Sequence, residues 1–263
     1  MTTEWLHARR AYDGLASHYD GLTADYDHQT WLRRLLQLVG HPGPRVLDVA
    51  CGTGKSFAPL VRQGCEISAC DISCAMLEIA RERLDLGARR VFAADMRDLP
   101  ACGLFDLITC LDDAVNYLRS PAELFLAFRS VARLLGRDGV FVFDANTLLT
   151  YRTAFAGSSE TLLGAERFRW RGLAGACATP GVQAAAVVER VMPDSLKTVA
   201  THQQRHHPIG EIVALLSAAG LVADAIVGQS TGCRLDRRAD ELRNTKTVFV
   251  ARLDLDSREF PRR

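Results

Sequence analysis

Five short apolar runs between residues 45 and 146 alternate with stretches of helical periodicity, and no other feature limits the fold as strongly. The runs cover residues 45–50, 65–71, 90–95, 105–111 and 139–146. Short apolar runs that end at turn residues are typical of buried strands. Strands that alternate with helices about every twenty to thirty residues indicate an α/β fold with a largely parallel, doubly wound sheet.

The segments between these strands carry helix signals. Lys55 to Gln63 is predicted to form a short helix. Ser73 is expected to cap the next helix, and Pro121 opens a third. The apolar faces of the second and third helices are predicted to contain Met76, Leu77, Ala80 and Leu84, and Leu124, Phe128, Val131 and Leu135, respectively.

The alternation of strands and helices stops after residue 150. Between residues 151 and 206, FRWRG and VQAAAVVERVM are predicted to form exposed antiparallel strands. Pro208 then starts a helix that Gly220 closes, and residues 221–228 and 245–253 form two last strands. The chain therefore divides into residues 1–40, a core of residues 41–150 and 207–253, and a β-rich insertion of residues 151–206.

Charge and composition exclude several classes of protein. The 32 Lys and Arg nearly equal the 31 Asp and Glu, and no long basic tract favours nucleic acid or an anionic membrane. The N-terminus does not resemble a signal peptide, and the longest apolar stretch, residues 212–223, is too short to span a bilayer. Eight cysteines without a C-x-x-C pair indicate buried, reduced thiols in a cytoplasmic protein.

The glycines of LDVACGTGKS, residues 47–56, allow three interpretations. A phosphate-binding P-loop would need glycine at position 49, which is Val49. A dinucleotide fingerprint would need its third glycine at position 57, which is Phe57. The remaining interpretation is a loop for an uncharged thioether nucleoside, because Gly52 and Gly54 let the backbone approach such a ligand closely.

Acidic residues at two later strand ends support this third interpretation. Asp71 lies seventeen residues after Gly54, where a carboxylate accepts hydrogen bonds from both ribose hydroxyls. Asp95 and Met96 end the third strand, where a carboxylate suits an exocyclic amine and Met packs on the ring. Each aspartate alone also fits a helix cap or a turn. Their common register with one glycine loop favours a binding site.

These segments resemble a known enzyme family. VLDVACGTG, CDIS, AADM and FDLITCLDDAVNYL together resemble the class I S-adenosylmethionine-dependent methyltransferases. The glycine loop and TADYDHQTWLRRLL resemble small-molecule N-methyltransferases of the glycine N-methyltransferase type. The resemblance implies a Rossmann-like, seven-stranded sheet that ends in an antiparallel strand, with S-adenosyl-L-methionine as cofactor. It also implies that residues 1–40 form a helical cap over the cofactor and that the inserted sheet covers the acceptor.

The resemblance also assigns cofactor-binding residues. Ala50 and Gly52 would contact the methionine part, and Leu111 would lie beside the sulfonium. Asp71 would hold the ribose, Asp95 and Met96 the adenine, and Tyr19 and Trp31 would close the N-terminal side. The set is completed by Asp48, Gly54, Ile72 and Met76.

One position departs from the glycine N-methyltransferases. Those enzymes place an arginine for the substrate carboxylate just before the TADY segment, where this chain has Leu22. Arg33 or a tyrosine hydroxyl would have to replace it. Glycine is therefore not the expected acceptor.

The candidate catalytic residues are Tyr12, Tyr19, Asp113, Tyr117 and His206. Asp113 follows the fourth strand at the sheet edge where α/β proteins bind ligands, although a helix-capping role fits it equally. Tyr12 and Tyr19 are seven residues apart and share one face of a helix, as packing residues or as a lid.

The segment THQQRHH offers further candidates in His202 and His207. It fits a metal site, an acceptor-lining base or an exposed polar strand. Since no carboxylate or cysteine lies at ligand spacing, no metal is expected.

The predicted function is methyl transfer to a small-molecule acceptor, at an amine nitrogen such as one of secondary metabolism. O-methylation of a small metabolite is the alternative, and modification of RNA or protein a more remote one. No nucleic-acid or membrane partner is expected, and a homo-oligomer is left open. The sequence does not name the acceptor.

Overall fold

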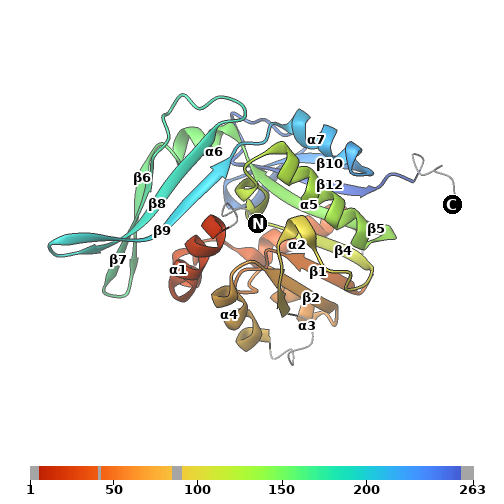
Figure 1. Ribbon diagram of the computed structural model, residues 1–263, viewed down its shortest axis with the longest axis horizontal. Coiled ribbons are helices and arrows are strands. Elements are labelled where there is room, and N and C mark those ends of the chain that lie inside the picture. The colour runs from red at the N-terminus through yellow and green to blue at the C-terminus, as the bar shows by residue number, and fades with distance from the viewer. Residues whose placement is uncertain (1–5, 41–42, 85–90, 256–263) are drawn as a thin grey trace.

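The computed structural model describes residues 6–40, 43–84 and 91–255 and contains two sheets (Figure 1). The larger sheet has the strand order β11-β10-β12-β5-β4-β1-β2-β3. Its parallel strands are β1 (Arg45–Val49), β2 (Glu66–Asp71), β3 (Val91–Ala93), β4 (Phe105–Cys110) and β5 (Leu135–Asn146). The predicted parallel, Rossmann-like core is confirmed.

Antiparallel strands complete this sheet. β12 (Lys246–Leu253) pairs with β5 and with β10 (Leu221–Ser230), as expected for the last strands. An eighth strand, β11 (Arg234–Asp236), pairs with the end of β10, so the expected number of seven is too low. Three residues after a 3₁₀ turn, η4 (Thr231–Cys233), are too few to give a strand signal in the sequence.

Helices cover both faces of the large sheet. α2 (His28–Val39), α3 (Ala58–Arg62) and α4 (Cys74–Leu84) pack on one face, and α5 (Pro121–Leu134) and α7 (Ile209–Ala218) on the other. The alternation of side chains along β5 divides the core accordingly: Val140 and Val142 face the first group and Phe141 and Phe143 the second. Two faces buried by helices explain why the core strands are continuously apolar.

Local signals set most of the helix ends. The Ser73 hydroxyl accepts a hydrogen bond from the Met76 N–H at 3.2 Å, so the predicted cap of α4 is confirmed. Gly220, with φ of 79°, lies just beyond the end of α7. Leu135 is buried as predicted, but it begins β5 instead of extending α5. The side chain of Leu84 and the strand start at Arg90 lie outside the described part of the chain.

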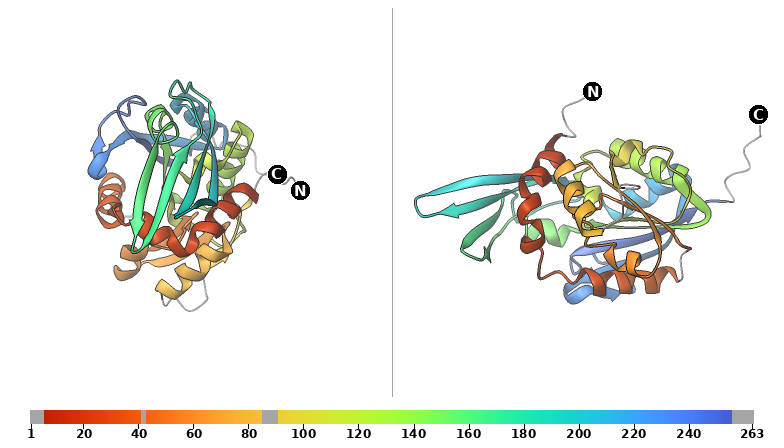
Figure 2. Two further views of the ribbon diagram at one scale, coloured as in Figure 1. Left: turned by 90° about the vertical axis from the view of Figure 1, so that its left-hand side faces the viewer. Right: turned by 90° about the horizontal axis from the view of Figure 1, so that it is seen from below.

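The insertion is an antiparallel sheet of four strands preceded by a short helix. α6 (Leu148–Thr153) leads into β6 (Ser158–Leu163), β7 (Glu166–Gly172), β8 (Gln183–Met192) and β9 (Ser195–Arg205). α1 (Leu6–Leu22) runs across this sheet, with the large sheet on its other side (Figure 2). Ala11 and Leu15 of α1 pack against Phe168, Val188 and Ala200 of the insertion.

Two further expectations concern exposure. Cys74, Cys102 and Cys177 are free but exposed, so the prediction of buried thiols is wrong for these three. In the described ranges, no helix is long and apolar enough to cross a membrane. β9 is a polar strand, but it is not simply exposed. Every second side chain near its end points inward, so His202 and Gln204 are buried.

Candidate active site

The carboxyl ends of the parallel strands meet at one edge of the large sheet. There β1 runs into a tight loop with positive φ at Ala50 (57°), Gly52 (54°) and Gly54 (80°). Two adjoining cavities open at this edge and share Ala50, Ile72 and Met96. We call them together the loop cavity. It is lined by eight of the predicted cofactor residues besides Tyr19: Asp48, Ala50, Gly52, Asp71, Ile72, Asp95, Met96 and Leu111.

Asp71 is the buried carboxylate of the loop cavity. Its Oδ2 accepts from the Gly52 N–H and its Oδ1 from the Ser73 N–H, both at 2.8 Å. Burial raises the pKa of Asp71 above its ordinary value. Since each carboxylate oxygen accepts more than one hydrogen bond, both oxygens can still accept from a ribose diol.

The glycine loop has the shape that a nucleoside ligand needs. A Cβ added at Gly52 would meet only Tyr19 Cε1, at 4.0 Å, so a side chain there would project into the loop cavity. Asp95 and Met96 lie at the far end, at the start of the 3₁₀ helix η2 (Met96–Asp98). Asp95 is paired with Arg97, whose guanidinium also contacts Glu123. The residues present therefore fit an adenosine held at the ribose by Asp71.

Asp48 has a supporting position beneath the loop. It is almost fully buried and accepts from Ser56 Oγ at 2.9 Å and from Thr109 Oγ1 at 2.6 Å. Burial raises its pKa to about 7. Asp48 thus ties β1 to β4 and to the residue after the glycine loop.

Four predicted site residues are not brought to a cavity. Trp31 is buried in the core between α2 and the large sheet, and Met76 is fully buried under α4. Gly54 turns the loop through its N–H bond to the Cys51 carbonyl. His206 is fully buried, accepts from the Gly181 N–H and pairs with Glu241, so the structure gives it an anchoring position and not a catalytic one.

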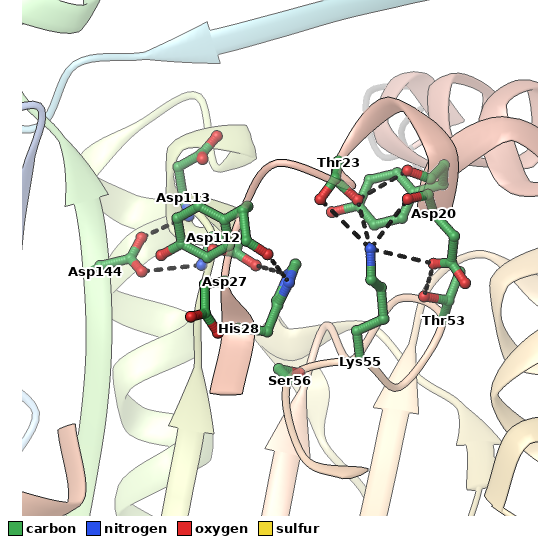
Figure 3. Close-up of polar contacts among 12 residues, drawn as sticks. Asp20, Thr23, Asp27, His28, Thr53, Lys55, Ser56, Asp112, Asp113 and Asp144 are labelled. Atoms are coloured by element: carbon green, nitrogen blue, oxygen red, sulfur yellow. Dashed lines mark hydrogen bonds and ion pairs between the residues drawn. The ribbon is translucent and has the colours of Figure 1, made fainter. Parts of the chain in front are cut away.

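The N-terminal side of the loop cavity is closed by residues that the sequence did not single out. His28 begins α2, lines the cavity and pairs with Asp112 at 3.3 Å. Lys55 also lines it, and its Nζ reaches the Asp20 and Thr23 carbonyls at 3.1 and 3.4 Å (Figure 3). Lys55 therefore holds the last turn of α1 onto the glycine loop. A histidine or a lysine at or near a helix start is common, so the sequence alone gives no signal. Only their position in the structure shows that His28 and Lys55 line the loop cavity.

An acidic cluster follows β4. Asp112 and Asp113 both have positive φ, 58° and 55°, and their N–H groups donate to the Asp144 carboxylate at 3.0 and 2.6 Å (Figure 3). The Lys246 Nζ lies between 3.1 and 3.4 Å from all three carboxylates. Lys246 and His28 hold the pKa of Asp112 down at about 2. Three carboxylates around one ammonium leave this cluster negatively charged.

A wide cavity of about 590 Å³ lies between the large sheet, α1 and the inserted sheet. Tyr12, Tyr19 and Tyr117 line both this wide cavity and the loop cavity, and no other described residue lines both. The Tyr12 and Tyr19 rings lie 6.0 Å apart and the Tyr12 and Tyr117 rings 5.4 Å apart. The three rings therefore form the wall where the two cavities meet, and Asp113 lies on the side of the wide cavity.

A hydrogen-bonded chain crosses this wall. The Tyr12 hydroxyl donates to the Tyr117 hydroxyl at 3.0 Å, and the Tyr117 oxygen lies 2.6 Å from His202 Nδ1. His202 Nε2 is buried without a hydrogen-bond partner. Burial lowers the pKa of His202 to about 4 and raises those of the tyrosines. These groups are therefore all neutral near pH 7.

Arg33, considered as a partner for a substrate carboxylate, is exposed on α2 and does not line the wide cavity. Leu22 does line it. The position that would carry the arginine is thus at the cavity but apolar.

Comparison with known proteins agrees with this geometry. Residues 46–139 match a family model described as a methyltransferase domain. The Bacillus subtilis protein YqeM, which carries the name of a methyltransferase, is 25% identical over 88% of this chain and 94% of its own length. Glycine N-methyltransferase of Rattus norvegicus is 32% identical, but the match covers only 45% of either protein.

Solved structures share the fold. A methyltransferase dependent on S-adenosylmethionine from Clostridium acetobutylicum superposes with a TM-score of 0.75 at 22% identity, over 92% of this chain and 98% of that one. The sugar N-methyltransferase KedS8 from Streptoalloteichus superposes with a TM-score of 0.66 at 24% identity, over 89% and 92%. At such identities the likeness establishes the fold. Residues 46–139 thus match a methyltransferase domain, and the chain as a whole has the Rossmann-like fold of S-adenosylmethionine-dependent methyltransferases.

Proposed function

We propose that this methyltransferase transfers the methyl group to an amine nitrogen of a small molecule held in the wide cavity. The observation that carries the proposal is the tyrosine wall, because only there do the two cavities meet in the described structure. Asp113, the charged side chain of the wide cavity, lies beside this wall and suits an ammonium group.

The residues of the loop cavity would hold the cofactor, which supplies a methyl group already activated on a sulfonium. Asp71 would accept from the ribose hydroxyls, Met96 would pack on the adenine, and Ala50, Gly52 and Leu111, which line the loop cavity, would surround the methionine part. The protein then has to align an acceptor with the methyl carbon, and such alignment is the main source of rate in a displacement of this kind.

The wide cavity would position the amine. Asp113 is fixed by Gln204 Nε2 at 2.6 Å and by Lys246, so its carboxylate has a defined place. Near the wall, the lone pair of the neutral amine would form the N–C bond with the methyl carbon, and the electron pair of the broken C–S bond would stay on sulfur. The ammonium proton leaves before this step, to Asp113 or water, so no base is needed in the transition state.

The arrangement of the chain supports separate roles for its parts. We infer that residues 1–40 cap the cofactor and that residues 151–206 cover the acceptor. α1 contributes Tyr12 and Tyr19 to the wall, and the inserted sheet contributes Trp170 and His202 to the wide cavity. Residues 41–150 and 207–253 then provide the core that holds the cofactor.

The names of similar proteins fit an amine acceptor. Both the rat enzyme and the sugar methyltransferase are named for transfer to nitrogen. One feature favours the second candidate, O-methylation: the neutral His202 bonded to Tyr117 could accept a hydroxyl proton through the tyrosine.

A screen of amines and alcohols, followed by formation of S-adenosylhomocysteine, tests the proposal. We expect turnover with amines, a product methylated at nitrogen by mass spectrometry and NMR, and no effect of a chelator. Tyr117→Phe, which removes the hydroxyl between Tyr12 and His202, should lower kcat by less than the ~10²-fold typical of an essential acid–base group. A product methylated at oxygen, together with a loss in Tyr117→Phe well beyond that range, would favour the second candidate instead.

A further inference from the structure

The lining of the wide cavity carries a negative charge, whereas the arginines of the neighbouring strand β7 lie outside the cavity. β7 reads Arg167, Phe168, Arg169, Trp170, Arg171, and alternate residues of a strand point to opposite faces. Phe168 and Trp170 line the wide cavity. The three arginines therefore lie on the far face of the inserted sheet.

All three arginines are engaged in ion pairs on that outer face. Arg167 and Arg169 pair with Glu160 at 3.3 and 2.9 Å, and Arg171 pairs with Glu189 at 2.9 Å. The inserted sheet thus keeps its cations away from the acceptor and turns aromatic and hydroxyl groups toward it.

Two lysines near the wide cavity, Lys55 and Lys246, are likewise bound to other groups and do not line it. Lys246 is surrounded by the carboxylates of Asp112, Asp113 and Asp144, and Lys55 binds oxygen atoms at the end of α1. Among the described residues that line the wide cavity, His202 is the one with a basic side chain. It stays neutral at pH 7 because burial lowers its pKa. Among the described residues that line the wide cavity, the charge at neutral pH is that of Asp113.

The remaining lining combines rings and hydroxyls. Phe155, Phe168 and Trp170 form an aromatic side, and the Trp170 Nε1–H is fixed by a 2.7 Å bond to the Ala154 carbonyl. The lining also contains Thr23, Thr150, Thr153, Ser158, Ser159 and Thr161. The hydroxyls of Thr23, Thr150 and Thr153 donate to main-chain carbonyls, so their oxygens can accept a hydrogen bond from a ligand. Such a lining suits the face of a ring and its neutral oxygen substituents.

We infer that the acceptor is an amine whose remaining body is a neutral ring or hydroxylated group without carboxylate or phosphate. This inference rests on the proposed function and narrows it. An acid group in the wide cavity would find no cationic partner among the described lining residues and would lie near the negative cluster of Asp112, Asp113 and Asp144. An amino acid, a sugar phosphate or a sugar on a nucleoside diphosphate is therefore disfavoured, whereas a free amino sugar or an arylalkylamine fits.

Three matched pairs of amines test this inference. They are phenethylamine and phenylalanine, 2-aminoethanol and O-phosphoethanolamine, and glucosamine and glucosamine 6-phosphate. Each is titrated calorimetrically into protein loaded with S-adenosylhomocysteine, and each is assayed for methyl transfer. We expect the member without the acid group to bind at least about tenfold more tightly in every pair that binds.

Substitutions that add a cation to the cavity provide the second arm. Leu22→Arg places a guanidinium where Leu22 lines the cavity, and Ser159→Arg places one at an exposed position opposite Trp170. Both substitutions should reduce the difference in affinity between the two amines of each pair by about tenfold. Leu22→Met and Ser159→Gln, similar in size but uncharged, should leave it unchanged. Ser159→Arg serves as the readout if Leu22→Arg folds poorly.

The outcomes separate this inference from the proposed function. Methylation at nitrogen with equal or better binding of the acid-bearing amines, or arginine variants that leave the difference unchanged, would overturn the inference alone. Absence of binding and turnover with every amine, combined with methylation of alcohols, would overturn the proposed function.

Discussion

At the scale of single residues, Asp71 links the glycine loop to the ligand that the loop is shaped for. Its two carboxylate oxygens accept hydrogen bonds from the Gly52 and Ser73 N–H groups, and its buried side chain lines the loop cavity. Substitution would thus remove the two proposed ribose contacts and would also release the backbone N–H groups of Gly52 and Ser73.

We therefore expect Asp71→Ala to weaken binding of S-adenosylhomocysteine by about 2–4 kcal/mol, which is roughly 30- to 1000-fold. Calorimetric titration measures it. Asp13→Asn is the matched control, because Asp13 accepts from the same Ser73, through its hydroxyl, but does not line the loop cavity. Equal affinities of Asp71→Ala and the wild type would contradict the assignment.

His202 gives stability a dependence on pH. Burial lowers its pKa to about 4 in the folded protein, against about 6.5 in the unfolded chain. The folded state then binds fewer protons between these two values, so the free energy of unfolding falls as the pH is lowered through this window.

Between pH 7 and pH 5, this group should cost about 2 kcal/mol of stability. Urea unfolding of the wild type and of His202→Gln at both pH values isolates the contribution. The variant should lose less stability than the wild type by about that amount. Parallel losses in the two proteins would show that His202 does not titrate in this way.

The sequence predicted those site residues whose position follows from a strand end. Asp71 ends β2, Leu111 directly follows β4 and Met96 lies three residues after β3, and parallel strands bring such positions to one edge. His202 was one of the sequence candidates, but its place at the tyrosine wall, like that of His28 at the loop cavity, depends on the packing of β9 and α2 on distant segments, which spacing along the chain does not encode. Trp31 shows the converse, because it lies in the right segment but points into the core.

At the scale of elements, the close approach of α1 to β9 is the contact that sets the tyrosine wall. A Cβ added at Gly14 would lie 2.3 Å from the Val199 carbonyl oxygen. Gly14 therefore lets the helix lie directly on the strand, between the positions of Tyr12 and Tyr19.

We expect Gly14→Ala to push α1 away from β9 and to destabilise the protein by about 1–3 kcal/mol, even though alanine favours a helix. Methyl transfer should fall, because Tyr12 and Tyr19 move with the helix. Gly210→Ala in α7 is the control: nothing lies within 4 Å of its added Cβ, so the same change should stabilise by about 0.5–1 kcal/mol. Chemical unfolding and the rate of S-adenosylhomocysteine formation measure both effects. A Gly14→Ala protein with wild-type stability would refute the role of this contact.

Elements that are buried on both faces were predictable, and elements that depend on their partners were not. β1, β4 and β5 each contain an apolar run and are buried along most of their length, because helices cover both sides of the sheet. β6 reads SSETLL, with mostly polar residues, and becomes a strand through its pairing with β7. α6 has only six residues, too few for a clear periodicity.

At the scale of the whole molecule, α1 connects the two sheets mechanically. On one side the Thr53 hydroxyl donates to the Asp20 carboxylate at 2.6 Å, and Lys55 and Arg83 bind the same turn of the helix. On the other side Ala11 and Leu15 pack on β7, β8 and β9. A ligand that orders the glycine loop should therefore also reduce the opening of the inserted sheet, although that sheet contributes only Gln203 to the described lining of the loop cavity.

Hydrogen exchange with and without S-adenosylhomocysteine tests this coupling. At a ligand concentration of about 100 Kd, binding stabilises the liganded state by about 2.7 kcal/mol, so amides that open only with the site should exchange about a hundredfold more slowly. We expect slower exchange in the glycine loop, in α1 and also in β9. In Asp20→Ala, compared at the same multiple of its own Kd, the protection should remain in the loop but be lost from β9, because the link between Thr53 and α1 is broken. Protection confined to the loop in the wild type would mean that the inserted sheet opens independently of the cofactor site, and the tyrosine wall would then be set by α1 alone.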